Sequence, residues 1–264
     1  MNTKKLTVWI TGASSGIGEA MAYEYAKKGA RVILSARSED KLKDVAGNCQ
    51  KLGGTTLIVP FDLEDSKQIE LQAKNTLKEI DKIDVLVNNG GISQRSYALE
   101  TPAEIDRKIM DTNFFGAVVF TKSILPSLIA GGGGKIIVIS SVVGKFGFPM
   151  RTAYSASKHA LQGFFEALRA ELFENNVSVT IVSPGRVYTN ISYNAIDKEG
   201  KKHGVLDPGQ ANGMAADVCA RKIISAAERG RKEFLVGGKE VIMVHIRRFF
   251  PRLFHKLARK IKPT

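Results

Sequence analysis

The segment from Ser141 to Lys158 carries three side chains that together could move a proton to or from a carbonyl oxygen. Tyr154 and Lys158 are four residues apart, and the apolar spacing of 153–174 predicts a helix with both on one face. An ammonium beside a phenol favours the phenolate, so we expect Lys158 to lower the tyrosine pKa from its usual value of about 10. Tyr154 is therefore the candidate general acid/base, although a YxxxK pair alone is more often structural.

Ser141 ends the apolar run KIIVISS, which predicts a buried strand. Its hydroxyl would emerge at the carboxyl end of the strand, where open α/β sheets bind their ligands. There Ser141 and Tyr154 could hold a carbonyl oxygen while hydride reaches its carbon. Asn113 lies among apolar neighbours in a long helix predicted over 103–130, where its amide is either a satisfied core group or a working one.

A glycine-rich turn lies near the start of the chain, in the sequence LTVWITGASSGIG of residues 6–18. The order is an apolar strand, the turn, and then a helix of about a dozen residues that ends near Gly29. Glycines allow close backbone approach, and a helix N-terminus offers free N–H groups to a pyrophosphate. The GxxxGxG spacing predicts a dinucleotide site, although a glycine turn alone could be a tight connection. The residues expected to line this site are Gly12, Ser14, Ser15, Gly16, Ile17 and Gly18.

The second predicted strand, RVILSARS over 31–38, ends without the acidic residue that usually holds the ribose 2′-hydroxyl of NAD. Arg37 and Ser38 stand there instead, and a guanidinium beside a hydroxyl suits a 2′-phosphate. NADP(H) is therefore favoured over NAD(H). The alternative is that Arg37 only opens the following helix.

Further strands are predicted over 56–61, 84–88, 177–183 and 233–236, with a helix over 215–229 before the last. Their ends add the remaining candidate cofactor residues, which are Asp62, Leu63, Asn88, Gly90, Pro184, Gly185, Val187 and Thr189. Asp, Asn and Gly are also common turn residues, so plain turns at the ends of 56–61 and 84–88 are the alternative. The alternation predicts one α/β domain over 1–238, a doubly wound Rossmann-type fold with about seven parallel strands. The polar, glycine-containing segment 190–214 is interpreted as a substrate lid, with a disordered insertion as the alternative.

Composition narrows the class of protein. The chain has 264 residues and 44% hydrophobic content, which suits one large domain with a full core. It has no run of 18 apolar residues and no signal-peptide pattern at its N-terminus, so a cytoplasmic protein is expected. Cys49 and Cys219 lack metal-ligand spacing and the four histidines form no cluster, so we expect no protein-bound metal.

The C-terminal segment 239–264 is strongly basic. It carries eight Lys and Arg residues and one Glu, a net charge of +7 within a total of +13. Apolar residues recur there at helical spacing, at Leu253, Leu257 and Ile261. The aromatic residues Phe249, Phe250 and Phe254 lie next to them, and the charge is carried by Arg252, Lys256, Arg259 and Lys260. Such an amphipathic extension predicts peripheral contact with a membrane surface. The alternative is a helix packed on its own domain or on a neighbouring subunit, and no nucleic-acid-binding motif accompanies the charge.

Four motifs follow one another along the chain: TGASSGIG, NNGG, Ser141 with YSASK, and PGRVYT. In this order and spacing they resemble the classical short-chain dehydrogenase/reductase family over almost the whole chain. The resemblance implies a catalytic tetrad of Asn113, Ser141, Tyr154 and Lys158. Tyr154 would give the proton and Ser141 would orient the carbonyl. Lys158 would hold the nicotinamide ribose and tune the phenol, while Asn113 would support a water-linked proton relay. The family more often has NNAG, and glycine at position 90 could loosen that turn.

The longer string NNGGISQRS, with LSAR and ASKHAL, is most similar to the dehydrogenase/reductase member seven branch, near the hydroxysteroid dehydrogenases. With Arg37 and Ser38 favouring NADP(H), we expect an NADP-dependent carbonyl reductase or alcohol dehydrogenase. The similarity implies a lipophilic steroid-, retinoid- or quinone-like substrate. It also implies a homodimer or tetramer. The alternative from another class is a catalytically idle dinucleotide-binding protein that senses redox state or binds at a membrane surface, but such a protein would not need Tyr154.

Overall fold

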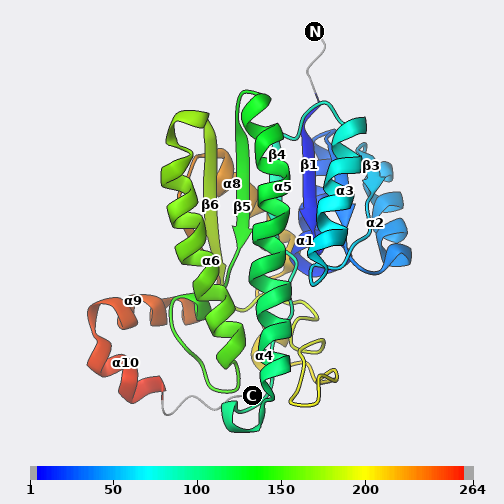
Figure 1. Ribbon diagram of the computed structural model, residues 1–264. Coiled ribbons are helices and arrows are strands. Elements are labelled where there is room, and N and C mark those ends of the chain that lie inside the picture. The colour runs from blue at the N-terminus through cyan, green and yellow to red at the C-terminus, as the bar shows by residue number, and fades with distance from the viewer. Residues whose placement is uncertain (1–4, 259–264) are drawn as a thin grey trace.

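A seven-stranded parallel sheet lies between two layers of helices in the computed structural model, which describes residues 5–258 (Figure 1). The strands are β1 (Thr7–Thr11), β2 (Arg31–Ser35), β3 (Thr55–Ile58), β4 (Val85–Asn88), β5 (Gly134–Ile139), β6 (Val177–Pro184) and β7 (Glu233–Val236). Their order is β3-β2-β1-β4-β5-β6-β7, so the direction of winding reverses between β1 and β4. Ligands bind at such a reversal, outside the carboxyl ends of the strands. The predicted doubly wound α/β fold is confirmed.

Helices cover both faces of the sheet. One layer holds α1 (Gly16–Lys27), α2 (Glu39–Lys51) and α8 (Ala216–Glu228), and the other holds α3 (Ser66–Glu79), α5 (Gly116–Ala130) and α6 (Thr152–Glu171). Strand β1 shows why both layers are needed, because Val8 and Ile10 pack in the first core cluster and Trp9 in the second. All five residues of β1 are buried, as expected for a central parallel strand.

The long helix predicted over 103–130 is present but interrupted. It consists of α4 (Ala103–Met110), a π-helical turn (Asp111–Phe115) and α5. Such turns are frequent at functional sites, and this one carries Asn113. Among the described residues, this is the one helix long and apolar enough to cross a membrane, but it packs against α3 and α6 as part of the helical layer.

The segment 190–214 is ordered and lies at the carboxyl edge of the sheet, where it forms the yellow loops of Figure 1. It contains only one short helix, α7 (Pro208–Ala211). Single β-bridges join Ile196 to Gln94 and to Lys202, and join Met214 to Val187. We refer to residues 190–214 as the lid.

After β7 the chain forms α9 (Ile242–Phe249) and α10 (Pro251–Ala258), which we call the tail helices and which lie beside the lower end of α6 (Figure 1). Phe254 is only 4% exposed, and its ring centroid lies 5.3 Å from that of Phe146, in the loop after β5. The tail therefore packs on its own domain through this face. Phe249 and Phe250 remain exposed, and Arg259, Lys260 and Ile261 lie outside the described residues.

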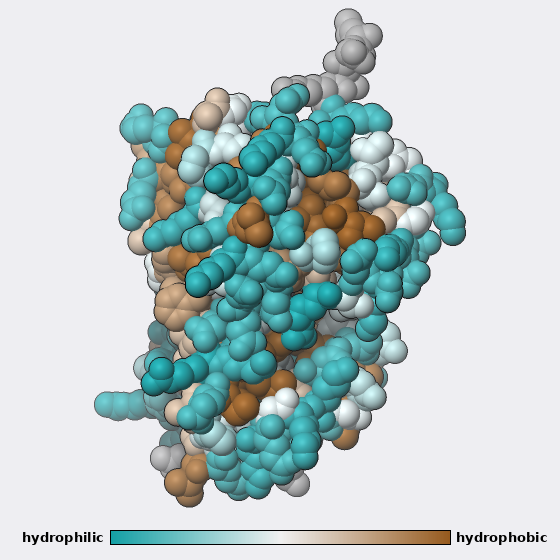
Figure 2. All heavy atoms as spheres, turned by 45° about the vertical axis from the view of Figure 1, so that its right-hand side comes forward, coloured by the Kyte–Doolittle hydropathy of each residue, from teal (hydrophilic) through white to brown (hydrophobic). Residues whose placement is uncertain are grey.

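The molecular surface is mostly hydrophilic on the face shown in Figure 2, where apolar side chains gather in several separate areas. This distribution suits a chain in which charged residues make up 25% of the sequence. Large apolar side chains are nevertheless exposed elsewhere in the described part of the chain, among them Ile242, Phe249, Phe250 and Leu253 of the tail helices.

Candidate active site

The turn after β1 is shaped by glycines. Gly12 and Gly16 have φ angles of 64° and 63°, in the left-handed region that favours glycine. A Cβ at Gly12 would lie 2.7 Å from the Cα of Gly90, so the turn packs directly on the chain that follows β4. Ser15 caps α1 without a side-chain hydrogen bond, which leaves the N–H groups of the first turn available to a ligand. This cradle fits a dinucleotide pyrophosphate.

One cavity of about 640 Å³ runs along the carboxyl edge of the sheet, a size typical of small-molecule sites. It brings together most of the predicted residues from six strand ends. Its lining includes Gly12, Ser14, Ser15, Gly16, Ile17, Arg37, Ser38, Asp62, Leu63, Gly90, Ser141, Tyr154, Lys158, Pro184, Gly185, Val187 and Thr189. Three predicted residues, Gly18, Asn88 and Asn113, lie outside this lining.

The structure corrects the prediction that the side chain of Asn88 lines the cofactor site. Its side chain is buried under the turn, and its Nδ2 donates a hydrogen bond of 2.8 Å to Oγ1 of Thr121. The neighbouring Asn89 lines the cavity instead, and its Nδ2 donates to the carbonyls of Thr11 and Gly12 at 3.0 and 3.1 Å. Successive side chains along a strand point to opposite sides. Asn88 therefore points to Thr121 of α5, and the next residue, Asn89, lines the cavity.

Gly18 and Gly90 lie where an added side chain would clash with neighbouring atoms. A Cβ on Gly18 would lie 2.4 Å from both the carbonyl oxygen of Gly12 and Nδ2 of Asn89. A Cβ on Gly90 would meet Cδ1 of Leu63, also at 2.4 Å. The alanine found more often at position 90 would therefore require Leu63 to move here, whereas a side chain at Gly18 would press on backbone.

Asn113 is a satisfied amide in this structure. Its Oδ1 accepts from the backbone N–H of Ile92 at 2.7 Å, and its Nδ2 donates to the Ile92 carbonyl at 2.9 Å and to Oγ of Ser157 at 3.0 Å. It thereby ties the loop after β4 to α6, the helix that carries Tyr154 and Lys158. A Cβ on Gly91 would lie 2.9 Å from Oδ1 of Asn113 and 3.5 Å from Nζ of Lys158, so the amide and the lysine flank the same glycine.

Lys158 is buried beside Tyr154. Its Nζ donates to the carbonyl of Ile139 at 2.9 Å and lies 5.8 Å from the centre of the Tyr154 ring. Burial in a site without a counter-charge disfavours the ammonium and lowers the pKa of Lys158 to about 8. The lysine is thus held at the carboxyl end of β5, next to the candidate proton carrier.

The electrostatic surroundings of Tyr154 differ from the sequence prediction. Burial raises the pKa of the phenol above its usual value, while hydrogen bonding with Ser141 and the charges of Arg95 and Arg151 act in the opposite direction. The expected lowering by Lys158 is not found. Desolvation is the dominant influence on the phenol, Arg95 and Arg151 are the cations that act on it, and the Lys158 ammonium is itself disfavoured by its own burial.

Sequence analysis missed several residues of the site. Oε1 of Gln94 accepts from the backbone N–H of Ala153 and of Tyr154, at 2.9 and 3.3 Å, and so caps the helix that carries Tyr154. Lys41 lines the cavity near Arg37, on the first turns of α2. The polar run SQRS at 93–96 is buried throughout, and four polar residues in succession after a strand end were its only sequence signal.

The adenosine end of the cavity is open and positively charged. Arg37 has an exposed side-chain fraction of 63%, and its Nη1 lies 3.9 Å from the carboxylate of Asp62 in a loose ion pair. Its guanidinium therefore remains accessible to an anionic group. Within residues 5–258 there is no group of three or more His, Cys, Asp or Glu side chains that could hold a metal ion.

A Rossmann-type sheet with a glycine cradle after β1 and serine, tyrosine and lysine side chains at the same edge defines a nicotinamide-dinucleotide-dependent oxidoreductase. A profile described as short chain dehydrogenase matches residues 6–200. The chain belongs to the short-chain dehydrogenase/reductase family.

Curated relatives agree with this assignment. The chain is 42% identical over 266 residues to dehydrogenase/reductase SDR family member 7B of Xenopus laevis, covering 97% of this chain and 82% of the relative. It is 43% identical over 234 residues to an Anopheles gambiae dehydrogenase/reductase SDR family protein 7-like, covering 87% of this chain and 74% of the relative. The predicted similarity to the member seven branch is confirmed.

Solved structures share the fold. A short-chain dehydrogenase from Streptomyces avermitilis superposes with a TM-score of 0.83 at 27% identity, covering 98% of this chain and 100% of that one. An alcohol dehydrogenase from the archaeon Thermococcus sibiricus, complexed with 5-hydroxy-NADP, gives a TM-score of 0.76 at 26% identity, covering 89% of this chain and 97% of that one.

Proposed function

We propose that the protein is an NADP(H)-dependent oxidoreductase that interconverts a carbonyl and an alcohol on a small lipophilic substrate, with Tyr154 as the acid/base. The observation that carries the proposal is the convergence of Ser141, Tyr154 and Lys158 on the cavity that also contains the glycine cradle. A protein that only bound a dinucleotide would need the cradle but not a phenol aimed into the same cavity.

The residues of the chain divide the chemistry between them. The bound dinucleotide supplies or accepts the hydride. In reduction the Tyr154 hydroxyl gives its proton to the carbonyl oxygen, and in oxidation the phenolate takes the proton from the alcohol. The Ser141 hydroxyl donates a hydrogen bond to the same oxygen and thereby stabilises the charge that develops on it. Lys158 adds positive charge next to the phenol, and Asn113 holds the loop after β4 against α6.

Preference for NADP(H) is supported by the side chains at the adenosine end. Arg37, Ser38 and Lys41 line the cavity where β2 ends, and two cations with one hydroxyl suit a 2′-phosphate. The archaeal alcohol dehydrogenase of similar fold is complexed with 5-hydroxy-NADP. Asp62 is the competing feature, because its carboxylate could accept from a ribose hydroxyl instead.

A lipophilic substrate is supported by apolar side chains at the substrate end of the cavity. Ile92, Ile191 and Ile196 line it, from the loop after β4 and from the lid. The proposal is tested by following NADPH oxidation by the purified protein with a panel of aldehydes, ketones, steroids, retinoids and quinones. We expect turnover of at least one lipophilic carbonyl and slower turnover with NADH. Tight cofactor binding with no turnover across the panel would favour the catalytically idle alternative.

We further propose that the tail helices contact an anionic membrane surface. Ile242, Phe249, Phe250 and Leu253 are exposed beside exposed Arg247, Arg248 and Arg252. Each such cation near an anionic surface contributes about 1 kcal/mol, and the attraction falls as salt rises. A variant with all three arginines replaced by glutamine should sediment less with phosphatidylserine liposomes at low salt than the wild type. Equal sedimentation would reject the membrane contact.

Assembly into a homodimer or tetramer is also proposed. Its support is the exposure of Phe115, Ile129 and Phe173, at 48%, 37% and 83%, in or next to the helices α5 and α6. Light scattering at several protein concentrations measures the subunit mass. A monomer at every concentration would reject the proposal.

A further inference from the structure

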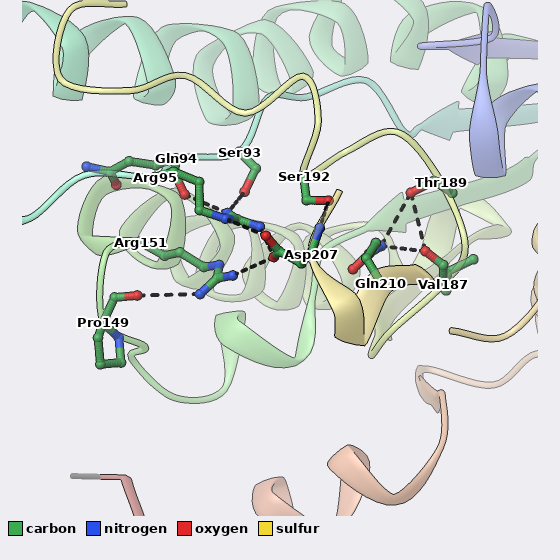
Figure 3. Close-up of polar contacts among 10 residues, drawn as sticks. All are labelled: Ser93, Gln94, Arg95, Pro149, Arg151, Val187, Thr189, Ser192, Asp207 and Gln210. Carbon is green, nitrogen blue, oxygen red and sulfur yellow. Dashed lines mark hydrogen bonds and ion pairs between the residues drawn. The ribbon is translucent and has the colours of Figure 1, made fainter. Parts of the chain in front are cut away.

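A buried cluster of three charged side chains lies between the lid and the catalytic helix (Figure 3). Arg95 and Arg151 both donate to the carboxylate of Asp207, through Nη2 atoms 2.5 and 3.0 Å from Oδ2, and Nε of Arg95 lies 3.4 Å from Oδ1. The exposed side-chain fractions are 5% for Arg95, 11% for Arg151 and 8% for Asp207. We call these three residues the lid clamp.

The clamp joins three segments that are distant in the sequence. Asp207 belongs to the lid, where its own N–H donates to Oγ of Ser192 at 3.1 Å. Arg95 follows β4, and its backbone N–H donates to the carbonyl of Ile196 in the lid at 2.8 Å. Arg151 directly precedes α6. The lid, the loop after β4 and the N-terminus of α6 are therefore held together by this one cluster.

The same loop also fixes Tyr154. Gln94, the neighbour of Arg95, is fully buried and accepts hydrogen bonds from the N–H groups of Ala153 and Tyr154. Met150, which precedes Arg151, has a left-handed φ of 59°, and its carbonyl accepts from the N–H of Ser96 at 3.3 Å. A strained backbone of this kind persists only where surrounding contacts over-determine it.

Stability alone is a weak explanation for the clamp. Burying two guanidinium groups against one carboxylate costs desolvation that the attraction only partly offsets, and apolar residues of similar volume often serve as well. A charged cluster does, however, fix geometry, because paired guanidinium and carboxylate groups accept few arrangements. The clamp also leaves one excess positive charge close to the phenol.

We propose that Asp207 is a positioning residue that couples lid closure to the placement of Tyr154, by holding Arg95 and Arg151 together. When the lid is seated, the carboxylate draws both arginines toward the N-terminus of α6, and Gln94 holds the Tyr154 backbone. When the lid leaves, the two arginines lose their shared partner and repel each other, so the start of α6 loosens.

The charges around Tyr154 agree with this assignment. Arg95 and Arg151 oppose the rise in the pKa of Tyr154, Nζ of Lys158 lies 5.8 Å from the centre of its ring, and Asp207 pairs with both arginines. Ile105 and Ile109 of α4 and Phe254 of α10 pack in the apolar clusters that contain Tyr154. Loss of one arginine should therefore raise the pKa of the phenol.

The test compares Asp207→Asn with the control Asp197→Asn. Asp197 is another lid carboxylate, which accepts only from backbone N–H groups of its own turn, at Glu199 and Lys201. We expect Asp207→Asn to raise hydrogen–deuterium exchange in the lid and in 152–158 together, and to lower kcat/KM on the order of 10-fold or more. Asp207→Glu should restore part of the protection from exchange and part of kcat/KM. The control should leave exchange in 152–158 unchanged.

Increased exchange in the lid alone, or in neither segment, would overturn the coupling. The kinetic part rests on the proposed function, whereas the exchange part needs no substrate, so a wild type without turnover would refute the function and leave the clamp testable. If Asp207→Asn does not fold, Arg151→Gln serves instead, because it leaves the pair of Arg95 and Asp207 intact. Arg151→Gln should also move the acid limb of the pH profile for alcohol oxidation up by about one pH unit, and an unmoved limb would contradict the proposal.

Discussion

The two halves of the active site are built in different ways. The cofactor half depends on short-range backbone geometry, in which Gly12, Gly16 and Gly18 form the cradle within seven residues of chain. The substrate half depends on contacts between distant segments, such as Arg95 with Asp207, which are 112 residues apart. Backbone geometry of the first kind can be inferred from a motif. Contacts of the second kind exist only once the chain has folded, and they can change while the cradle stays intact.

This difference predicts the largest effect for a small change in the cradle. Gly18→Ala would place a Cβ 2.4 Å from the Gly12 carbonyl oxygen, so the backbone of the cradle must move. We expect NADPH binding to weaken by a factor on the order of 10² or more, since the cradle N–H groups would no longer converge on one site. Isothermal titration calorimetry measures the Kd.

A glycine elsewhere gives the matched control. A Cβ at Gly47, within α2, meets nothing within 4 Å. Gly47→Ala should therefore keep the NADPH affinity and stabilise the fold by about 0.4–1 kcal/mol. Equal affinities of the Gly18 and Gly47 variants would show that the cradle does not need glycine.

The tail helices adjoin the substrate half, because Phe254 packs in the same apolar cluster as Tyr154, and their substitutions should affect stability according to burial. Phe254→Ala removes a ring that is 4% exposed, and we expect a loss of about 3–5 kcal/mol in the free energy of unfolding. Phe249→Ala, in the same tail but 65% exposed, should change it by less than about 0.5 kcal/mol. Urea unfolding of both variants gives the comparison, and similar losses would contradict the packing of α10 on the domain.

Lys158 lies where the two halves meet, and it should make the free energy of unfolding depend on pH. Its pKa is lowered to about 8 in the folded protein, while the unfolded chain has the ordinary value of 10.5. Between these values the unfolded state binds more protons, so this residue makes the folded state more stable as pH rises.

The contribution of Lys158 must be separated from that of other groups. Burial raises the pKa of Cys49 to about 11 and that of Cys219 to about 12, which lowers stability as pH rises above about 9. The difference in unfolding free energy between wild type and Lys158→Met isolates the lysine. It should increase from pH 8 to pH 10.5 by about 3 kcal/mol at most. A constant difference would show that Lys158 stays protonated in the fold.

The smallest effect is expected at the open end of the cofactor half. Arg37→Asp should shift preference from NADPH towards NADH by a factor on the order of 10, because the side chain is 63% exposed and water screens its charge. Arg31→Asp is the control, since it makes the same charge change at the opposite end of β2. Binding of both cofactors is titrated at one ionic strength. An equal shift in the two variants would remove Arg37 from the site.

Much of the fold and the cradle could be predicted because the signals are local. The seven strands, the glycine turn and the spacing of Tyr154 and Lys158 follow from runs of neighbouring residues. Asn88 was assigned to the cofactor instead of Asn89 because the face of a short strand depends on a register of one residue. The electrostatics of Tyr154 were predicted with the wrong sign, since burial and two distant arginines cannot be inferred from a YxxxK pair.

The substrate half was largely beyond prediction from sequence. Nothing in the sequence pairs Asp207 with Arg95 or Phe254 with Phe146, because each pair depends on how remote segments meet. The tail shows the same limit. Its basic amphipathic pattern allowed a membrane surface, a subunit or its own domain, and only the folded structure places Phe254 in an intramolecular cluster.

The central claim is that Tyr154 is the proton carrier of a functional oxidoreductase, and Tyr154→Phe tests it most directly because it removes one hydroxyl and little else. The measurement is kcat for reduction of the best carbonyl substrate, together with the Kd for NADPH. We predict a Kd within about twofold of the wild type, and a kcat lower by a factor on the order of 10² or more. Undiminished turnover in Tyr154→Phe with normal NADPH binding would contradict the account.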